Sequence, residues 1–312
     1  MRRGRPGERR MTVPINPRCG FVALVGAPNA GKSTLINAFV GSKVAIVSPK
    51  VQTTRTRVLG ITIEGDSQIV FVDTPGIFEP RRRLDRAMVA AAWAGAQDAD
   101  IVVLLVDASQ GRVSKESWSI VDGLAKTGRR AMLALNKVDV APRARLLEMS
   151  AALNERGAFE ATFMISALTG DGIDDLRHAL ETALPEGPWL YPDDQLSDMP
   201  ERLLAAEITR EKLFLRLRQE LPYSATVETE SWEEREDGSV RIAQVVYIQR
   251  DSQKAIVLGK GGQMIKAIGS AAREELESLL ERRVHLSLFV KVREHWGDDP
   301  DRYRDWGLDY NA

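Results

Sequence analysis

The residues from Gly26 to Ser33 read GAPNAGKS and fit the phosphate-binding pattern G-x-x-x-x-G-K-[ST]. In such a loop, backbone N–H groups surround the phosphates, the lysine reaches the β- and γ-phosphates, and the serine hydroxyl binds Mg²⁺. One match is weak evidence, because a chain of this length meets the pattern by chance roughly once in a hundred cases. Phosphate contacts are expected from Gly26, Ala27, Pro28, Asn29, Ala30, Gly31, Lys32, Ser33 and Thr34.

Three further motifs follow in the order that a guanine-nucleotide site requires, namely Asp73-Thr74-Pro75-Gly76, Asn136-Lys137-Val138-Asp139 and Ser166-Ala167-Leu168. The Asp139 carboxylate can accept from guanine N1–H and from its N2 amine, a donor pair that adenine lacks. A wrong base would leave that carboxylate buried and unpaired, which gives discrimination of roughly 10⁴. Asn136 and Lys137 are expected to brace the loop and stack on the base, while a backbone N–H of the Ser166–Ala167 turn meets guanine O6. The four motifs together predict a site for GTP and GDP.

A magnesium ion is expected between Ser33, Asp73 and a threonine of the polar stretch 48–57. Thr54 is the first choice for that threonine and Thr53 the second. A loop of this composition can be ordered by the γ-phosphate and Mg²⁺ and released after hydrolysis. The chemical step is therefore assigned to Lys32, Thr54 and Gly76.

The nucleotide-binding stretch that begins at Asp73 ends with Ile77, where GTPases of the Ras type place a water-orienting glutamine. Isoleucine cannot orient water, so intrinsic hydrolysis should be slow, on the order of 10⁻⁴ to 10⁻² s⁻¹. The arginine run 81–83 lies nearby. It is interpreted either as a solvated basic stretch or as the source of an arginine finger.

Composition narrows the class of protein. The 312 residues carry 43 basic and 44 acidic side chains, so any nucleic-acid surface must be a local patch. A single cysteine, Cys19, excludes an internal disulfide and a thiolate zinc site, and the three histidines lack metal-like spacing. No apolar run reaches the ~18 residues of a membrane span, and no apolar segment follows the arginine-rich start. These features favour a cytoplasmic protein. We also expect a monomer, and peripheral contact with the inner membrane stays open.

The first half alternates short apolar runs with helical patterns. The runs are 21–25, 69–72, 101–106, 132–135 and 163–165, and the helices are expected near 33–40, 84–97, 115–127, 146–156 and 173–183. This alternation predicts a doubly wound, mostly parallel α/β sheet of the P-loop type, with one antiparallel hairpin from 58–63 and 68–72 at its edge.

The second half has a different order: helix, strand, strand, helix, glycine loop, helix, strand. We expect a helix over 201–220 with Leu204, Ile208 and Leu215 on one stripe, strands at 224–230 and 239–249, and a helix from Ser252. A second helix, with Ile268, Ala272, Leu276 and Leu279 in its core stripe, runs to Arg282 before a strand at 284–292. The predicted divisions are a basic arm (1–18), a nucleotide-binding domain (19–187), a linker (188–200), a second domain (201–295) and a tail (296–312).

The glycine loop of the second half is a candidate clamp for single-stranded RNA. Loops of this kind bring backbone amides and helix N-termini to about four nucleotides. Its alternative interpretation is a tight inter-helix turn with scattered lysines. The predicted RNA-binding residues are Lys254, Gly259, Lys260, Gly261, Gly262, Lys266 and Arg273.

The assembled motifs resemble the Era family of GTPases over about residues 20–295. The likeness depends on GAPNAGKS, on QTTR at 52–55, on DTPGI, NKVD and SAL, and above all on IVLGKGGQMIKAIG at 256–269. It implies a G domain followed by an α+β KH domain of type II. It also implies binding to the 3′ region of small-subunit (16S) ribosomal RNA, help in 30S assembly and rRNA maturation, and slow GTP hydrolysis that switches this association. The resemblance further implies a K⁺ ion held partly by Asn29, which then joins the catalytic set.

Two alternatives stay open. One is an RNA chaperone that is permanently loaded with nucleotide and has no significant turnover. The other is a tRNA-modifying GTPase of the same superfamily, which would need a formyl-transfer-type partner domain and usually a C-terminal cysteine; the sequence contains neither.

Overall fold

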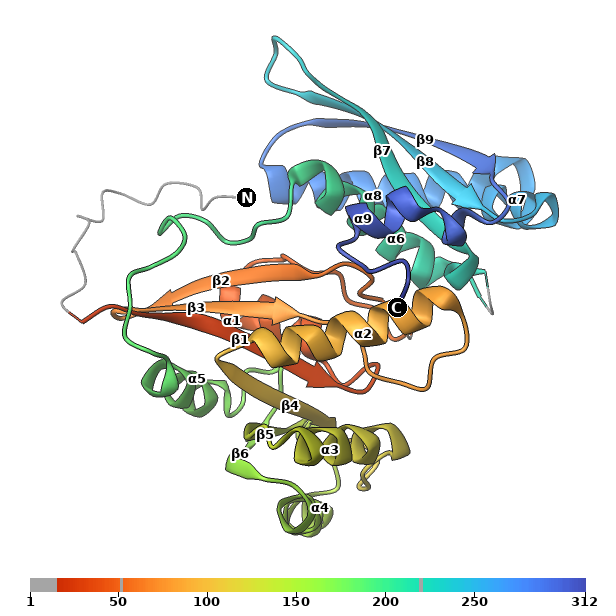
Figure 1. Ribbon diagram of the computed structural model, residues 1–312. Coiled ribbons are helices and arrows are strands. Elements are labelled where there is room, and N and C mark those ends of the chain that lie inside the picture. The colour runs from red at the N-terminus through yellow and green to blue at the C-terminus, as the bar shows by residue number, and fades with distance from the viewer. Residues whose placement is uncertain (1–15, 51–52, 219–220) are drawn as a thin grey trace. The chain divides into compact units, whose positions relative to one another are not determined.

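The computed structural model describes residues 16–50, 53–218 and 221–312, which group into two compact units (Figure 1). The first unit contains 16–45, 54–198 and 303–312. The second contains 199–302, without 219–220, together with the described part of 46–53. Most of the predicted basic arm (1–18) lies outside the described residues.

The first unit is built on a six-stranded sheet with the order β2-β3-β1-β4-β5-β6. Its strands are β1 Arg18–Gly26, β2 Val58–Glu64, β3 Ser67–Asp73, β4 Ile101–Asp107, β5 Ala131–Asn136 and β6 Phe159–Ile165. Only β2 pairs antiparallel, with β3 at the sheet edge; the other neighbours are parallel. The predicted α/β class and its edge hairpin are confirmed.

Helices cover both faces of this sheet because its strands are apolar on both sides. Side chains of α1 (Lys32–Val40) and α5 (Ile173–Ala183) pack on one face with Val22 and Leu24. Side chains of α2 (Arg83–Asp98), α3 (Lys115–Thr127) and α4 (Arg143–Arg156) pack on the other with Val25 and Leu104. Parallel strands then deliver their carboxyl ends to one edge, where the loops after β1, β3, β4, β5 and β6 lie.

The second unit has a three-stranded sheet, β7-β8-β9, packed with helices (Figure 1). Its elements are α6 Glu201–Arg216, β7 Ala225–Glu234, β8 Val240–Ile248, α7 Asp251–Leu258, α8 Gln263–Leu280 and β9 Val284–Val292. Strands β7 and β8 are antiparallel, whereas β8 and β9 are parallel. The two helices between β8 and β9 supply the crossover that a parallel pair needs. Val257 of α7 and Ile268 of α8 belong to the same buried core as Val246 and Ile248 of β8.

Several predicted details differ in the structure. The first helix of this unit ends at Arg216 instead of continuing to 220, and Leu215 is 49% exposed rather than part of a core stripe. Glu211, one turn earlier on the same stripe, is buried, and its carboxylate accepts a hydrogen bond from Val47 N (2.7 Å). Leu279 is only partly buried, and β7 continues to Glu234 along its partner β8.

The C-terminal segment contains a short helix, α9 (Pro300–Asp305), and several buried aromatic residues. In the second unit, Trp296 is buried and its Nε1 donates to Ser224 O (3.0 Å). In the first unit, Tyr303 contacts the rings of Trp306 and Tyr310. Among the helices of the described ranges, none is both long enough and apolar enough to cross a membrane.

Candidate nucleotide and RNA sites

The phosphate loop lies between β1 and α1, and close packing explains its glycines. A Cβ at Gly26 would stand 2.6 Å from Leu105 O, and one at Gly31 would stand 2.2 Å from Asn136 Nδ2. Gly31 also has φ +100°, and Asn29 has φ +62°, so the chain turns through left-handed conformations here. The loop is thus held against the ends of β4 and β5.

Lys32 is buried at the start of α1. Its Nζ donates to Gly26 O and Ala27 O, both at 3.1 Å. Burial lowers the Lys32 pKa to about 8, and the nearby Asp73 carboxylate opposes this shift. The hydrogen bonds to the loop carbonyls hold the ammonium in place, and the Asp73 carboxylate offsets only part of the effect of its burial.

Three predicted metal-binding residues meet beside Lys32. Ser33 Oγ donates to Asp73 Oδ2 (2.8 Å), Thr54 Oγ1 donates to the same oxygen (3.1 Å), and the two hydroxyls are 3.1 Å apart. Burial raises the Asp73 pKa, against the Lys32 charge and these two hydrogen bonds. Asp73 Oδ1 is buried without a hydrogen-bond partner among the described residues. A cluster of hard oxygen atoms with one unsatisfied carboxylate oxygen suits Mg²⁺.

Thr53, the second choice, faces a different environment. Its hydroxyl lies 3.0 Å from Ser48 Oγ and donates to Lys50 O at 2.7 Å. The geometry therefore favours Thr54 over Thr53 as the metal-site threonine.

The segment after Asp73 lies against the phosphate loop. Thr74 Oγ1 donates to Leu24 O (2.7 Å), and Ile77 N donates to Gly26 O (3.1 Å). A Cβ on Gly76 would come within 2.9 Å of the Pro28 backbone, so only glycine permits this approach. Ile77 is itself buried, and the side chain that could orient water is absent at this position.

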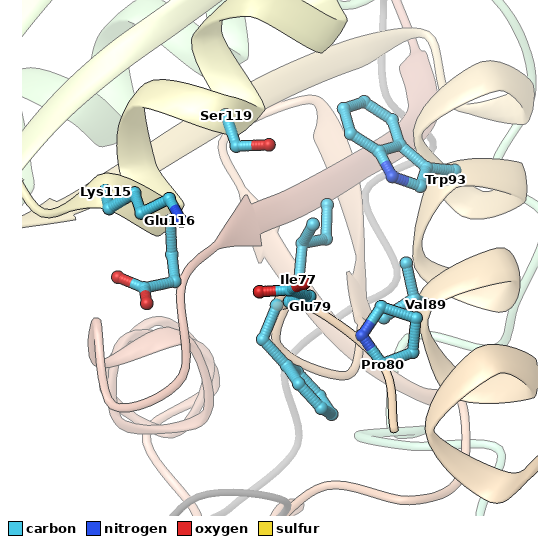
Figure 2. A pocket seen from close by; sticks show the side chains of 9 residues that line it. Ile77, Glu79, Pro80, Val89, Trp93, Lys115, Glu116 and Ser119 are labelled. Atoms are coloured by element: carbon cyan, nitrogen blue, oxygen red, sulfur yellow. The ribbon is translucent and has the colours of Figure 1, made fainter. Parts of the chain in front are cut away.

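A cavity of about 390 Å³ adjoins Ile77 between the segment 77–80 and helices α2 and α3 (Figure 2). It has apolar residues on one side and polar residues of α3 on the other. Its lining consists of Ile77, Phe78, Glu79, Pro80, Val89, Trp93, Lys115, Glu116 and Ser119. The arginines at 81–83 are exposed, and Arg83 stacks on the Tyr310 ring at 4.4 Å from its centroid.

On the base side, Asn136 connects two loops. Its Nδ2 donates to Ala30 O (2.7 Å), and its Oδ1 accepts from Ala167 N (2.9 Å). The structure thereby brings the NKVD and SAL motifs to the phosphate loop. Asp139 and Leu168 are both exposed, and the covering of the Asp139 carboxylate by a guanine base stays a prediction.

Two supporting residues were missed by the sequence reasoning. Asp107 Oδ2 accepts from Lys137 Nζ at 2.6 Å. Asn37 accepts from Val44 N and Ala45 N and donates to Ala45 O, which fixes the chain just before residue 46. The signal for Asp107 is its place directly after the apolar run 101–106, equivalent to the place of Asp73 after its own run.

The glycine loop of the second unit separates α7 from α8. Gly259, Gly261 and Gly262 all have positive φ (72°, 59° and 75°), and a Cβ on Gly259 would stand 2.7 Å from Met264 Cβ. No added Cβ at Gly261 or Gly262 would meet an atom within 4 Å, so their surface is open.

The basic residues around this loop differ in availability. Lys260 and Lys266 are exposed and Lys254 is partly exposed, whereas Arg273 Nη1 is bonded to Glu277 Oε2 at 2.9 Å. Two apolar side chains of the same unit, Ile256 on α7 (58%) and Phe289 on β9 (53%), are unusually exposed. Sequence reasoning did not identify them.

The segment 46–53 belongs to the second unit because of its contacts with α6. Besides the bond from Val47 N to Glu211, Lys50 Nζ donates to the carbonyl oxygens of Phe214 and Leu217, and Arg210 donates to Thr53 O. The lysine thus satisfies carbonyls at the carboxyl end of the helix, where positive charge is favourable.

Two family models match the chain. Residues 21–137 match the family described as 50S ribosome-binding GTPase, and residues 220–297 match the KH domain. The first contains the phosphate loop and Asp73, and the second contains the glycine loop, which confirms the predicted combination of a GTPase domain and a KH domain.

Curated relatives and solved structures extend this match to nearly the whole chain. A GTPase Era of Rhizobium meliloti (strain 1021) is 63% identical over 95% of this chain and 94% of its own length, and one of Sinorhizobium medicae is 64% identical over 95% of each. A structure of Aquifex aeolicus Era bound to GDP·AlF₄⁻ is 37% identical, with a TM-score of 0.87 over 93% of this chain and 99% of its own. A structure of Era with MgGDPNP and nucleotides 1506–1542 of 16S ribosomal RNA is 38% identical, with the same TM-score and coverage. Similarity of this extent shows that the chain belongs to the GTPase Era family and is a GTP hydrolase.

Proposed function

We propose that this GTPase binds the 3′ region of small-subunit ribosomal RNA through its KH domain and assists assembly of the 30S subunit and rRNA maturation in the cytoplasm. The observation that carries the proposal is the joint presence of the phosphate-loop site and the open glycine loop in one chain. The 38% identical Era structure that contains 16S nucleotides 1506–1542 supports this RNA as the ligand.

In the nucleotide site, Ser33, Thr54 and Asp73 would hold Mg²⁺, and Asp139 would select guanine. When bound, Mg²⁺ supplies positive charge to the β- and γ-phosphate oxygens. Lys32 adds a second positive charge at the same place, and the Ile77 position explains a low intrinsic rate. We assign Asn29, at φ +62°, as a partial ligand of K⁺, which would supply charge that an arginine finger would otherwise give.

In the RNA site, the backbone at Gly261 and Gly262 is open to a phosphate chain, and Lys260 and Lys266 supply free positive charge. Arg273 should contribute less than predicted because Glu277 already pairs with it. The exposed Ile256 and Phe289 offer apolar surface on which unstacked bases can pack. Truncating either of them should weaken binding to the 3′ rRNA segment.

We further propose that the described residues of the segment 46–53, above all Lys50 and Thr53, transmit the nucleotide state to the KH unit. Thr53 and Lys50 are fixed on α6, and Thr54, the next residue, bonds Ser33 and Asp73. A metal ion and γ-phosphate that reposition Thr54 must therefore strain or release the adjoining bonds to α6. Hydrolysis would reverse this change and favour departure from the RNA.

The test combines RNA binding and turnover for the full chain. The dissociation constant for an RNA of the 16S 3′ end is measured with Mg·GTP analogue and with Mg·GDP, and phosphate release is followed with and without 30S particles. We expect tighter binding with the GTP analogue, by at least about fivefold, as is usual for coupled sites. Multiple-turnover hydrolysis is expected as well. Equal affinities would refute the switch, and RNA affinity without turnover in K⁺ or Na⁺ would favour the chaperone alternative.

A matched pair of variants tests the transmitting segment. Lys50→Met removes the bonds to the end of α6 and should bring the two RNA affinities closer together, while Lys126→Met alters an exposed lysine of α3 and should preserve their ratio. An unchanged ratio in Lys50→Met would show that these contacts do not carry the coupling.

A further inference from the structure

Lys137 begins the turn after β5 in a constrained backbone. It has φ +68°, and the flanking bonds Ala108 N to Asn136 O (2.9 Å) and Val138 N to Ile165 O (3.2 Å) fix the chain on both sides. This backbone sets the direction of the side chain but not the position of its distal atoms. A lysine side chain carries about 2 kcal/mol of rotamer entropy, so a free Lys137 would be ordered only when a nucleotide arrives.

Asp107 removes that freedom. It ends β4 and is the register partner of Asn136 on β5, so it stands beside the NKVD turn. Its Oδ1 accepts from Ser109 N (2.9 Å), which fixes the carboxylate, and its Oδ2 accepts from Lys137 Nζ (2.6 Å). These hydrogen bonds and the lysine charge hold the Asp107 pKa below its ordinary value, against the effect of burial.

We infer that Asp107 is a positioning residue for the nucleotide base. By anchoring the ammonium of Lys137, it leaves the four-carbon stem as a preformed apolar surface for a planar base, and it lowers the ordering cost of binding. The inference rests on the proposed role of Lys137 at the base. Because this action does not involve the phosphates, GDP and GTP should depend on Asp107 equally.

A double-mutant cycle in the full chain tests the inference. Calorimetric titration with Mg·GDP should show that Asp107→Ala weakens binding by about three- to tenfold, in line with a partly exposed charge-assisted bond. Lys137→Ala should weaken it at least as much, and the double variant should equal Lys137→Ala. Additive losses would mean that Asp107 acts through another group, and an unchanged or tighter affinity in Asp107→Ala would also overturn the inference.

Three further measurements separate positioning from loss of structure. Competition by magnesium tripolyphosphate, which has no base, should be unchanged in Asp107→Ala. Asp107→Asn retains an acceptor for Ser109 N and should recover part of the affinity. Glu148→Ala breaks the exposed Arg145–Glu148 pair (2.6 Å) in the same unit and should have no effect. If tripolyphosphate binding falls in parallel with GDP binding, the effect is structural and the inference fails.

The same variants distinguish this inference from the proposed nucleotide site. If Lys137→Ala itself binds GDP normally, the assignment of the base site is wrong. If Lys137→Ala binds weakly while Asp107→Ala binds normally, the base site stands and only the positioning role is refuted.

Discussion

Replacing Lys32 with methionine should stabilise the nucleotide-free protein while it destroys nucleotide binding. Lys32 is 7% exposed, and its charge is surrounded by loop carbonyls and one carboxylate. Its pKa falls from 10.5 to about 8 on folding. The native state therefore disfavours the charged form of Lys32, although binding of the phosphates requires it. The nucleotide-free protein is thus less stable than it would be without this buried charge.

The magnitude follows from the pKa difference. One pKa unit corresponds to about 1.36 kcal/mol, so the charged lysine costs roughly 3 kcal/mol at neutral pH. Loss of the bonds to Gly26 O and Ala27 O offsets part of that cost, at about 0.5–1.5 kcal/mol each. Together the two lost bonds offset about 1–3 kcal/mol, so Lys32→Met should raise the free energy of unfolding of the first unit by up to about 2 kcal/mol.

The pH dependence gives an independent check with a definite sign. Because the folded pKa is lower, the unfolded chain binds more protons between pH 8 and 10.5, and stability rises with pH across this window. The cost is fully present below about pH 8 and is lost above about 10.5. From pH 7.5 to 9.5 the wild type should therefore gain about 2 kcal/mol relative to Lys32→Met.

Urea unfolding of nucleotide-free protein in EDTA, at pH 7.5, 8.5 and 9.5, measures this difference. Tryptophan fluorescence reports on both units, so hydrogen exchange of amides in β1 and β4 supplies the value for the first unit. The exposed Lys126→Met variant should shift stability by less than about 0.5 kcal/mol at pH 7.5. A Lys32→Met protein that is less stable than wild type, or parallel curves of stability against pH, would refute the reasoning.

Three other perturbations probe the remaining assignments. Asp139→Asn should shift preference from GTP toward xanthosine triphosphate by at least tenfold, and unchanged GTP affinity in a binding titration would contradict the base assignment. Gly261→Asp should weaken binding to the 16S 3′ segment by about tenfold or more, because it places a negative charge and a strained φ of +59° on the phosphate path; nucleotide affinity should stay within twofold, and equal RNA binding would exclude the loop. Replacing K⁺ with Na⁺ should slow phosphate release several-fold in the wild type but not in Asn29→Ala, and identical rates would eliminate the potassium site.

The sequence was most informative where one local pattern determines both structure and chemistry. Apolar runs bounded by motif residues located the strands, and the carboxyl ends of parallel strands then had to converge. The glycine spacing at 259–262 located the break between two helices. Glycine favours the positive φ found there, and this preference can be seen in the local sequence. Thr54 was the first choice over Thr53 in the polar stretch 48–57, and the bonds to Ser33 and Asp73 agree with that preference.

The sequence failed where a residue's surroundings come from distant parts of the chain. Leu215 was placed in a core stripe by periodicity alone, yet Glu211 is buried instead because it binds Val47, 164 residues away. The place of Asp107 after the apolar run 101–106 is visible in the sequence, but its bond to Lys137 depends on the register between β4 and β5.

Thr53 belongs to the second unit and Thr54, the next residue, belongs to the first. On one side of the peptide bond between them the chain is fixed to α6 by backbone and lysine contacts, and on the other it is fixed to the carboxylate that is expected to hold the metal ion. A flexible linker would absorb a movement of Thr54 at no cost. A trans peptide keeps consecutive Cα atoms 3.8 Å apart, so between two anchored neighbours only rotations about φ and ψ can absorb that movement. If the proposed coupling is right, we therefore expect a change at the γ-phosphate to reach α6 through this short connection.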